Sequence, residues 1–524
     1  MAAKVTPKKD RIPLGSKLAF GSGHFVLNLL PGALGFFMFF LLTAFGMDPF
    51  LAGLLGGLPR LFDAITDPVM GFISDNTKSK YGRRRPYIFF GAILSGILFI
   101  LLWQLNPENS QAYNFWFFLI MSMVFLIGNT MFATPLVGLG YEMTSDYNER
   151  TRLMAFSQSM GQIAWMIVPW FWVIIADPNI FENQAIGVNK MATYIGVVCI
   201  IFGVIPAFFC KGIDSANMEN RKEISFKTLL SNIKELYQSI VEVARNKPFL
   251  KLCGATFLVF NGFQIVAAFS VFIIVFYMFD GSYEGAGTWP AWFSMISAIL
   301  TAFIIIPIVS WLSGKFGKRM AFIISTALSI VGYLLKWWGF DNELNARFNE
   351  TSFAQFLNNI VYNIFEFLNP YLDTVGMSWF SIDVSYGIPW LIFMPIPFIA
   401  FGLGGLFTLM LSMTADVCDL DELKNGMPRK EGTFGAVYWW MVKLGQALAL
   451  IIGGLVLKLV GFDQNAAQQT TETLTQLRIA DIVIPAVTAG IAIIVMWKYD
   501  LTEEKTNEIK EQLIERRGEL SRKN

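Results

Sequence analysis

The sequence predicts an all-α polytopic membrane protein whose twelve spanning helices form two six-helix halves. The chain of 524 residues is 54% hydrophobic and only 15% charged, whereas a soluble protein carries about 25% charged residues. Apolar runs of roughly 20 residues, long enough to cross a bilayer, recur along the whole chain. Similar charged motifs follow the second and the eighth run, so the second half repeats the first.

The first half is expected to occupy residues 18–210, after a basic tail at 1–17. Its first apolar run is too long for the apolar region of a signal peptide, and no cleavage motif follows it. We therefore expect this run to remain as a helix. The six spans of this half are predicted at 18–44, 48–73, 87–105, 113–140, 153–176 and 190–210.

The second half is expected to occupy residues 250–498. A basic linker, 211–249, separates the halves, and the periodic pattern of 226–243 predicts an amphipathic helix on the membrane surface. A polar tail, 499–524, follows the last span. The six spans of this half are predicted at 250–280, 289–313, 320–340, 388–413, 433–461 and 478–498.

Lysine and arginine are distributed unevenly between the loops. Most of the 40 Lys and Arg residues lie in the two tails, the linker and alternate loops, whereas the opposite loops contain only Arg347. Because loops rich in Lys and Arg stay on the cytoplasmic side, both termini are predicted to be cytoplasmic.

One predicted external loop, 341–387, is acidic and far longer than the others. Apolar residues from Phe353 to Leu368 recur in it at helical spacing. Part of this loop is therefore expected to form a helix, either on the membrane surface or over the external mouth.

The second span contains three charged residues, Arg60, Asp63 and Asp67. A spacing of four residues puts both carboxylates on one helix face, and Arg60 lies one turn before Asp63 as their charge partner. Two aspartates inside a membrane cost about 5–7 kcal/mol unless they are compensated. One guanidinium leaves one negative charge, which a bound cation would balance. A structural ion pair with one protonated aspartate is the alternative.

Charged residues at matching places in the two halves form a candidate cytoplasmic gate. They are, in chain order, Asp75, Arg83, Arg84, Asp146, Glu149, Arg150, Asp416 and Asp419. Two similar bundles with such loops are what a rocking-bundle transporter needs, since the charges can pair across the halves when that side is closed. The alternative is that they are solvated loop residues.

The stretch Asp63-Ala-Ile-Thr-Asp67-Pro68 to Gly71, followed by Asp75 and by the basic residues 80–86, resembles the signature of the glycoside–pentoside–hexuronide:cation symporters. This is the melibiose-permease branch of the major facilitator superfamily. A second signature matches around Asp416, Asp419 and Glu422, with a lysine, Lys443, in the eleventh span. The resemblance covers essentially the whole chain.

The resemblance implies a major facilitator fold and a symporter that works by alternating access in the bacterial inner (plasma) membrane. The expected partners are a small-molecule cargo, a sugar or glycoside, and a coupling cation, Na⁺, Li⁺ or H⁺. No other cofactor and no nucleic acid are expected, and the protein is expected to be a monomer.

The resemblance also assigns residues to the two sites. Asp63 and Asp67 become the cation ligands, a possible Na⁺ site, with hydroxyl oxygens from Thr66 and Thr130. Lys443 is similar to the family lysine that lies between the cation and the substrate.

The cargo site departs from the family pattern. Asn28, Ala133 and Gln158 stand where melibiose permeases carry charged sugar-binding residues. Amides can still bind hydroxyl groups and a tryptophan can stack on a sugar ring, although helix packing is the alternative role. The candidate substrate residues are Asn28, Asn129, Gln158, Gln162, Trp439 and Lys443. The neutral residues also leave a second cargo open, a lysolipid or another non-sugar solute.

Other functional classes fit less well. The sequence has no Ser/His/Asp set, no HExxH motif and no P-loop, so we do not expect an enzyme. One histidine, His24, and four cysteines argue against a histidine-based metal site and against a disulfide framework. A channel is disfavoured because the halves repeat within one chain and no selectivity-filter-like segment is found.

Overall fold

The computed structural model describes residues 11–144, 147–211, 245–374, 388–425, 431–466 and 468–523, with single residues 225, 228, 231, 234, 238, 241, 377 and 380. The chain divides into two compact units, unit 1 from Met1 to Glu235 and unit 2 from Leu236 to Asn524. Every regular element within the described ranges is a helix, which confirms the predicted all-α class.

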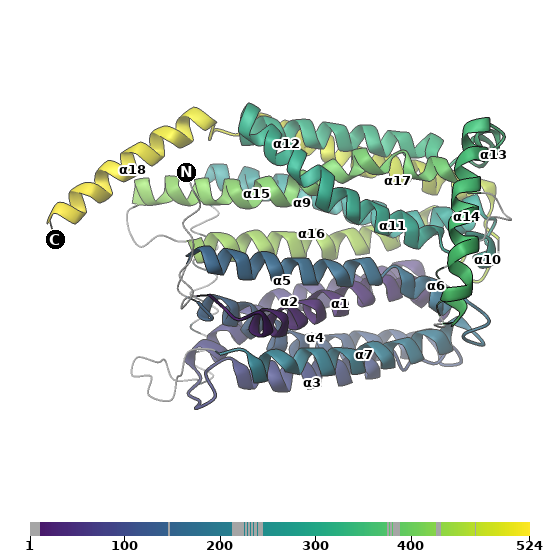
Figure 1. The fold of residues 1–524 in the computed structure, drawn as a ribbon, viewed down its shortest axis with the longest axis horizontal. Coiled ribbons are helices and arrows are strands. Elements are labelled where there is room, and N and C mark those ends of the chain that lie inside the picture. Colours follow the sequence, from purple (N-terminus) through teal and green to yellow (C-terminus); the bar gives the residue numbers. More distant parts are fainter. Residues whose placement is uncertain are drawn as a thin grey trace. The chain divides into compact units, whose positions relative to one another are not determined.

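Unit 1 is a bundle of long helices, drawn in purple to blue in Figure 1. They are α1 (Leu14–Thr43), α2 (Pro49–Asn76), α3 (Arg85–Leu102), α4 (Gln111–Glu142), α5 (Tyr147–Ile167), α6 (Trp170–Ala176) and α7 (Gln184–Phe209). Helix α3 packs against α4 and α7, α1 packs against α5 and α7, and α2 packs against α4.

Unit 2 is a second bundle with additional short helices (Figure 1). Its spanning elements are α9 (Lys247–Phe272), η2 (Ile273–Met278), α11 (Trp289–Leu300), η3 (Thr301–Ile305), α12 (Ile306–Gly339), α15 (Ile396–Asn425), α16 (Glu431–Leu459) and α17 (Thr471–Trp497). Its other elements are α10 (Tyr283–Ala286), α13 (Asn342–Asn349), α14 (Ser352–Thr374), η5 (Trp390–Phe393) and α18 (Glu503–Lys523).

The helix pairs of unit 2 repeat those of unit 1. Helix α12 packs against α15 and α17, as α3 does against α4 and α7. Helix α9 packs against α16 and α17, as α1 does against α5 and α7. The sequence repeat is therefore a structural repeat.

Glycine permits the same close helix contact in both units. A Cβ on Gly91 of α3 would lie 2.5 Å from the backbone nitrogen of Phe132 in α4. A Cβ on Gly332 of α12 would lie 2.6 Å from the backbone nitrogen of Ile399 in α15. Small residues of this kind let membrane helices approach closely without a bulky side chain between them.

The predicted twelve spans are accounted for within the described residues. Ten stretches are long and apolar enough to cross a membrane, by length and composition. One of them, 289–339, contains two predicted spans, because Gly317 with φ 77° and ψ 158° interrupts its helix. Helix α2 is not among the ten, since its charged residues lower its hydropathy, and it is the remaining span.

The fifth predicted span, 153–176, is not one continuous helix. Helix α5 ends at Ile167 and α6 begins at Trp170. Pro169 lies between them and has no N–H to donate to the helical ladder, which explains the break. The predicted surface helix at 226–243 falls mostly outside the described residues.

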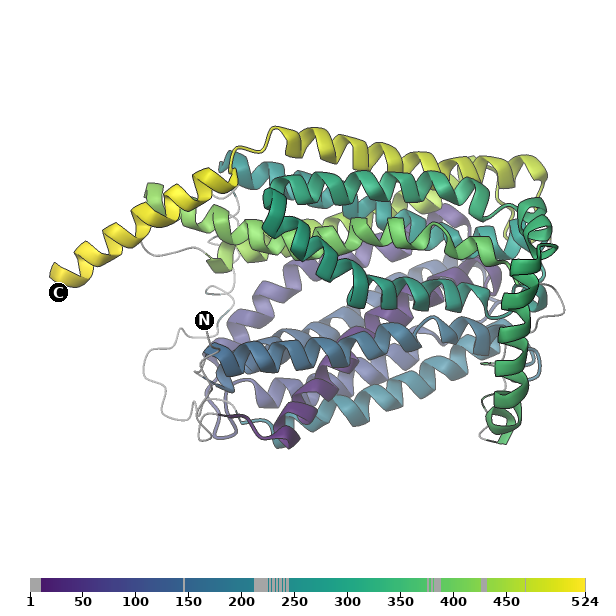
Figure 2. The ribbon, with the colours of Figure 1, turned by 45° about the horizontal axis from the view of Figure 1, so that its top comes forward.

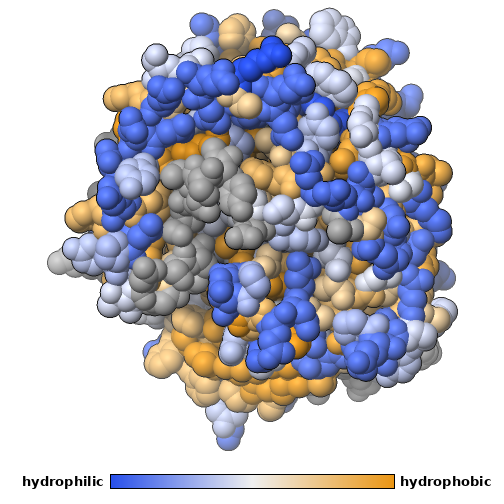
Figure 3. Space-filling model, turned by 90° about the vertical axis from the view of Figure 1, so that its right-hand side faces the viewer, coloured by the Kyte–Doolittle hydropathy of each residue, from blue (hydrophilic) through white to orange (hydrophobic). Residues whose placement is uncertain are grey.

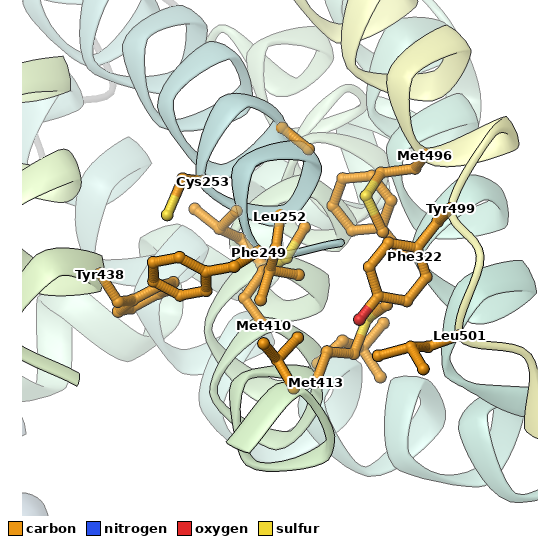
Figure 4. Close-up of a cluster of buried hydrophobic side chains, with 14 of the residues drawn as sticks. Phe249, Leu252, Cys253, Phe322, Met410, Met413, Tyr438, Met496, Tyr499 and Leu501 are labelled. Atoms are coloured by element: carbon orange, nitrogen blue, oxygen red, sulfur yellow. The ribbon is translucent and has the colours of Figure 1, made fainter. Parts of the chain in front are cut away.

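An apolar core holds unit 2 together at one end of its bundle. Figure 4 shows Phe249 of α9, Phe322 of α12 and Met410 of α15 within one cluster of buried apolar side chains. Tyr499, which follows α17, is buried against the same cluster, and burial raises the pKa of its hydroxyl.

Helix α18 lies in the predicted tail 499–524 and contributes to this core. Its residues Ile509 and Leu513 are buried, and the helix packs against α15. Just before it, Asp500 accepts a hydrogen bond from Lys251 Nζ at 2.8 Å, which lowers the pKa of the aspartate. The C-terminal helix is thus a packed part of unit 2.

Candidate functional site

The charged stretch of α2 lies inside unit 1, on a helix that packs against α4. Asp48 caps the helix N-terminus by accepting from the backbone N–H groups of Phe50 and Leu51, and Pro49 occupies the first helical position. Further along the helix, Asp63 is buried at 5% exposure and Asp67 is half-buried.

Hydroxyl and carboxylate oxygens from α2 and α4 gather around Asp63. Thr130 Oγ1 donates to Asp63 Oδ1 at 3.0 Å. Thr66 Oγ1 donates to the Asp63 carbonyl at 3.1 Å and lies 3.2 Å from Thr130 Oγ1. The structure thus brings together three of the four residues that were predicted to bind the cation.

The fourth residue, Asp67, accepts a hydrogen bond from a threonine that sequence reasoning missed. Thr134 Oγ1 donates to Asp67 Oδ1 at 3.3 Å. Thr130 and Thr134 are four residues apart on α4, the same spacing as Asp63 and Asp67 on α2. Two packed helices with matching spacings place each threonine opposite one aspartate, so that spacing is a signal that could have identified Thr134.

The chemistry of this cluster suits a small hard cation. Carboxylate, hydroxyl and carbonyl oxygens are the ligands that hard cations prefer. Arg60 lies three residues before Asp63, and the two charges act on each other. Two carboxylates and one guanidinium leave one negative charge in the span. No group of three or more His, Cys, Asp or Glu side chains that could hold a metal occurs among the described residues.

The predicted substrate residues are distributed over both units. Asn28 on α1 donates from Nδ2 to the His24 carbonyl at 2.8 Å and accepts from Trp165 Nε1 at 3.0 Å. Asn129 on α4 is buried, and its Oδ1 has no hydrogen-bond partner among the described residues. Gln162 on α5 is exposed, and the side chain of Gln158 is not described. In unit 2, α16 carries the exposed Trp439 and the half-buried Lys443.

Three predicted gate residues of unit 1, Asp75, Arg83 and Arg84, form an ion-pair network with one glutamate. Glu142, the last residue of α4, lies 2.6 Å from Arg83 Nη2 and 2.6 Å from Arg84 Nε. Arg84 Nη2 lies 2.6 Å from Asp75 Oδ1 at the end of α2. A Cβ at Gly138 would overlap the Arg84 guanidinium, so the absence of a side chain at this glycine leaves room for the guanidinium. Glu142 was not among the predicted gate residues, although it follows the fourth span as Asp416 follows the tenth.

Unit 2 carries a similar ion pair at the matching place. Lys318 Nζ lies 2.5 Å from Asp416 Oδ2 on α15, and Asp419 is half-buried one turn later. Of the other predicted gate residues, Glu149 on α5 is buried and binds Lys17 Nζ at 2.6 Å. The side chain of Arg150 is not described, and Asp146 lies outside the described residues.

A second charged cluster, not predicted from the sequence, lies inside unit 2. Lys336 on α12 and Asp481 on α17 form an ion pair, and each side chain is only 1% exposed. Lys336 also donates to Ser270 Oγ at 3.1 Å. Arg478, one turn before Asp481, donates to the Trp337 carbonyl at 2.6 Å and lies over the Trp337 ring. The sequence signal that could have indicated this cluster was the presence of charged residues inside the predicted spans 320–340 and 478–498.

Comparison with known proteins gives one family. The sequence profile described as MFS/sugar transport protein matches residues 19–503. An isoprimeverose transporter of Lactiplantibacillus pentosus is 23% identical, over 95% of this chain and 91% of that protein. The sodium-dependent lysophosphatidylcholine symporter 1-B of Danio rerio is also 23% identical, over 97% of this chain and 91% of that protein.

Solved structures with the same fold include a mutant form of the nucleoside transporter NupG. It has a TM-score of 0.59 and 15% sequence identity, and the match covers 92% of this chain and all of that one. The likeness concerns the fold alone.

Proposed function

Because this chain belongs to the MFS/sugar transport protein family, we propose that it is a secondary active transporter that uses a Na⁺ or H⁺ gradient to import a sugar or glycoside. The family consists of membrane transporters, so the chain is a multi-pass transporter and not an enzyme. The coupling ion, the cargo and alternating access are parts of the proposal.

The observation that carries the proposal is the oxygen cluster between α2 and α4. Asp63 is buried, its carboxylate accepts from Thr130, and Thr66 adds a third oxygen-bearing side chain. A buried carboxylate in a membrane is costly unless a positive charge compensates it. A cation bound at this site compensates the carboxylate, and the cost returns when the cation leaves. If the cation binds from one side of the membrane and leaves on the other, the state of the site depends on the cation, as coupled transport requires.

The gradient is large enough for uptake against a concentration difference. A tenfold Na⁺ gradient supplies about 1.4 kcal/mol, and 100 mV supplies about 2.3 kcal/mol per charge. Their sum of about 3.7 kcal/mol would support roughly 500-fold accumulation at one cation per cargo molecule.

The experiment that tests the coupling site is Asp67→Asn in proteoliposomes. We expect the variant to insert normally but to lose cation-driven accumulation, because one carboxylate charge is gone. Asp48→Asn is the matched control on the same helix, since Asn is an equally good N-cap. Full gradient-driven accumulation by Asp67→Asn would overturn the proposal.

A lysolipid is the second candidate cargo, and one structural observation favours it. Both ends of the Asn28 amide are already engaged, by the His24 carbonyl and by Trp165, which leaves Asn28 less able to bind sugar hydroxyls. A lysophosphatidylcholine symporter is also among the similar proteins. Thermal stabilisation of the purified protein, measured with Na⁺ against a panel of glycosides and lysolipids, separates the two cargoes. Stabilisation by lysolipids alone would exclude the sugar.

We place the protein in the bacterial plasma membrane with both termini in the cytoplasm, as a monomer. The uneven distribution of Lys and Arg between the loops supports this orientation. A cysteine introduced at the exposed Glu508 of α18 tests it. A membrane-impermeant thiol reagent should label it in inside-out vesicles, and labelling in right-side-out vesicles would reverse the orientation.

A further inference from the structure

Helix α14 begins beside α13 at one end of the unit 2 bundle and runs at a steep angle to the spanning helices of that unit in both ribbon views (Figure 1, Figure 2). It follows the C-terminal end of α12 and precedes α15. Lys318 and its basic loop lie beside the interruption at Gly317, at the opposite end of the helical stretch 318–339, so α14 lies away from that loop. The face of the molecule at this end is largely hydrophilic, with hydrophobic side chains along its edge (Figure 3).

Asparagine side chains fix this segment to unit 2. Asn345 of α13 donates to the Gly339 carbonyl at the end of α12 and accepts from the Leu391 N–H of η5, both at 3.0 Å. Asn358 of α14 accepts from Trp390 Nε1 at 2.7 Å. Helix α14 is therefore hydrogen-bonded to η5, and α13 before it is hydrogen-bonded to the end of α12 and to η5.

Three different faces run along α14. One face is buried at Ala354 and Phe365, and the Phe365 ring lies edge-on to Trp292 of α11, with 6.4 Å between the ring centroids. A second face is polar, with Gln355 and Asn359 exposed. The third face is apolar and uncovered, and at 100° per residue its members form a single stripe. The stripe consists of Phe353, Phe356, Ile360, Ile364, Phe367 and Tyr371, which are 40–67% exposed.

The surroundings of the stripe indicate a membrane interface. Trp337 and Trp338 end the neighbouring α12 and are both exposed, and tryptophan is enriched where membrane helices meet the headgroup layer. The lipid-facing side of α12 continues below them with the exposed Val331 and Leu334. These exposed side chains of α12 are thus apolar up to its last turn, where the segment that carries α14 begins.

The charged residues of α14 indicate which lipid headgroups the helix would contact. The helix contains the acidic Glu366 and Asp373 and no Lys, Arg or His. It therefore has no side chain that would attract an anionic lipid headgroup, and its affinity for a membrane comes from apolar burial.

We propose that α14 is an interfacial anchor whose aromatic stripe is embedded in the headgroup–acyl boundary of the outer leaflet, among neutral or zwitterionic phospholipids. The assignment to the outer leaflet rests on the proposed orientation, whereas the proposed contact with lipid does not depend on the cargo or on the coupling ion. The anchor ties unit 2 to the membrane surface at the point where α12 and α15 are joined.

The test places a fluorescent thiol label on each face in the full-length protein. The four native cysteines are buried, so an introduced surface cysteine is labelled selectively. Phe356→Cys and Phe367→Cys report on the stripe, and Gln355→Cys and Asn359→Cys are controls on the polar face of the same helix. Each protein is reconstituted in phosphatidylcholine nanodiscs, with and without bromine on the upper acyl chain.

We expect brominated lipid to remove most of the fluorescence of the stripe labels, and aqueous iodide to quench only the control labels. Replacing part of the phosphatidylcholine with phosphatidylglycerol should change neither result. Iodide quenching of the stripe labels would place the stripe in water and overturn the proposal. Stripe labels protected from both quenchers would mean that a protein surface, such as a second copy, covers them, and a requirement for anionic lipid would contradict the assigned partner.

Discussion

Replacing one partner of the Lys336–Asp481 ion pair is expected to destabilise unit 2 strongly, whereas replacing both is expected to cost less. Each side chain is 1% exposed, so removal of one leaves the other as a buried charge with less compensation. Removing one partner of a buried ion pair in this way lowers the free energy of unfolding by about 3–5 kcal/mol. Lys336→Met and Asp481→Leu remove the charges and keep similar side-chain volumes.

The two single variants should differ because Arg478 also acts on Asp481. Lys336→Met leaves the carboxylate with the charge of Arg478 nearby, so we expect a loss near the lower end of that range. Asp481→Leu leaves two cations without a carboxylate, so we expect a loss near the upper end. The double variant leaves one buried cation, Arg478, which keeps its hydrogen bond to the Trp337 carbonyl, so its loss should be smaller than that of either single variant.

The assay is a double-mutant cycle on the free energy of unfolding, measured by SDS titration of the purified protein in micelles. The pair Glu343–Arg347 in the same unit is the control, since its side chains are 84% and 73% exposed. Its cycle should give about 0–1 kcal/mol. A Lys336→Met loss no larger than this control would refute the reasoning, and so would a double variant that suffers the sum of the two single losses.

Two further predictions concern unit 1. Gly138→Ala should displace Arg84 from its ion pairs and lower the free energy of unfolding by about 1–3 kcal/mol, the usual cost of overpacking. Gly254→Ala is its control, because a Cβ there meets nothing within 4 Å, and equal stability losses would contradict the prediction. Thr130→Val should weaken cation binding, measured by calorimetry, about tenfold to a hundredfold, since hydrogen bonds to charged groups contribute about 1.5–3 kcal/mol. Unchanged affinity would remove this hydroxyl from the site around Asp63.

Hydropathy was sufficient to predict the spans, because every helix that crosses a membrane must satisfy its backbone internally and expose apolar side chains. Even α2 was predicted in spite of its charges, since those charges recur on one face. The interruption at Pro169 was missed because a proline inside an apolar run leaves the hydropathy unchanged. The break in the helix just before α6 became evident only from the backbone of the structure.

Side-chain pairing was much harder to predict from the sequence. Asp63 and Asp67 attract notice locally, because they share one helix. Lys336 and Asp481 are far apart in the chain, and only the packing of α12 against α17 brings them together. The charge of Arg84 was recognised, but its local partner, Glu142, could not be chosen from several loop acids without the structure.

The position of α18 affects how the protein reaches its final state during synthesis. Leu501, Ile509 and Leu513 belong to the core of unit 2, yet they follow all the spanning helices of that unit along the chain. Unit 1 can complete its packing while unit 2, Leu236–Asn524, is still being translated, which takes about 15–60 s at 5–20 residues per second. The core of unit 2 must wait until α18 has been synthesised, so premature termination before α18 would leave an apolar surface open to quality-control proteases.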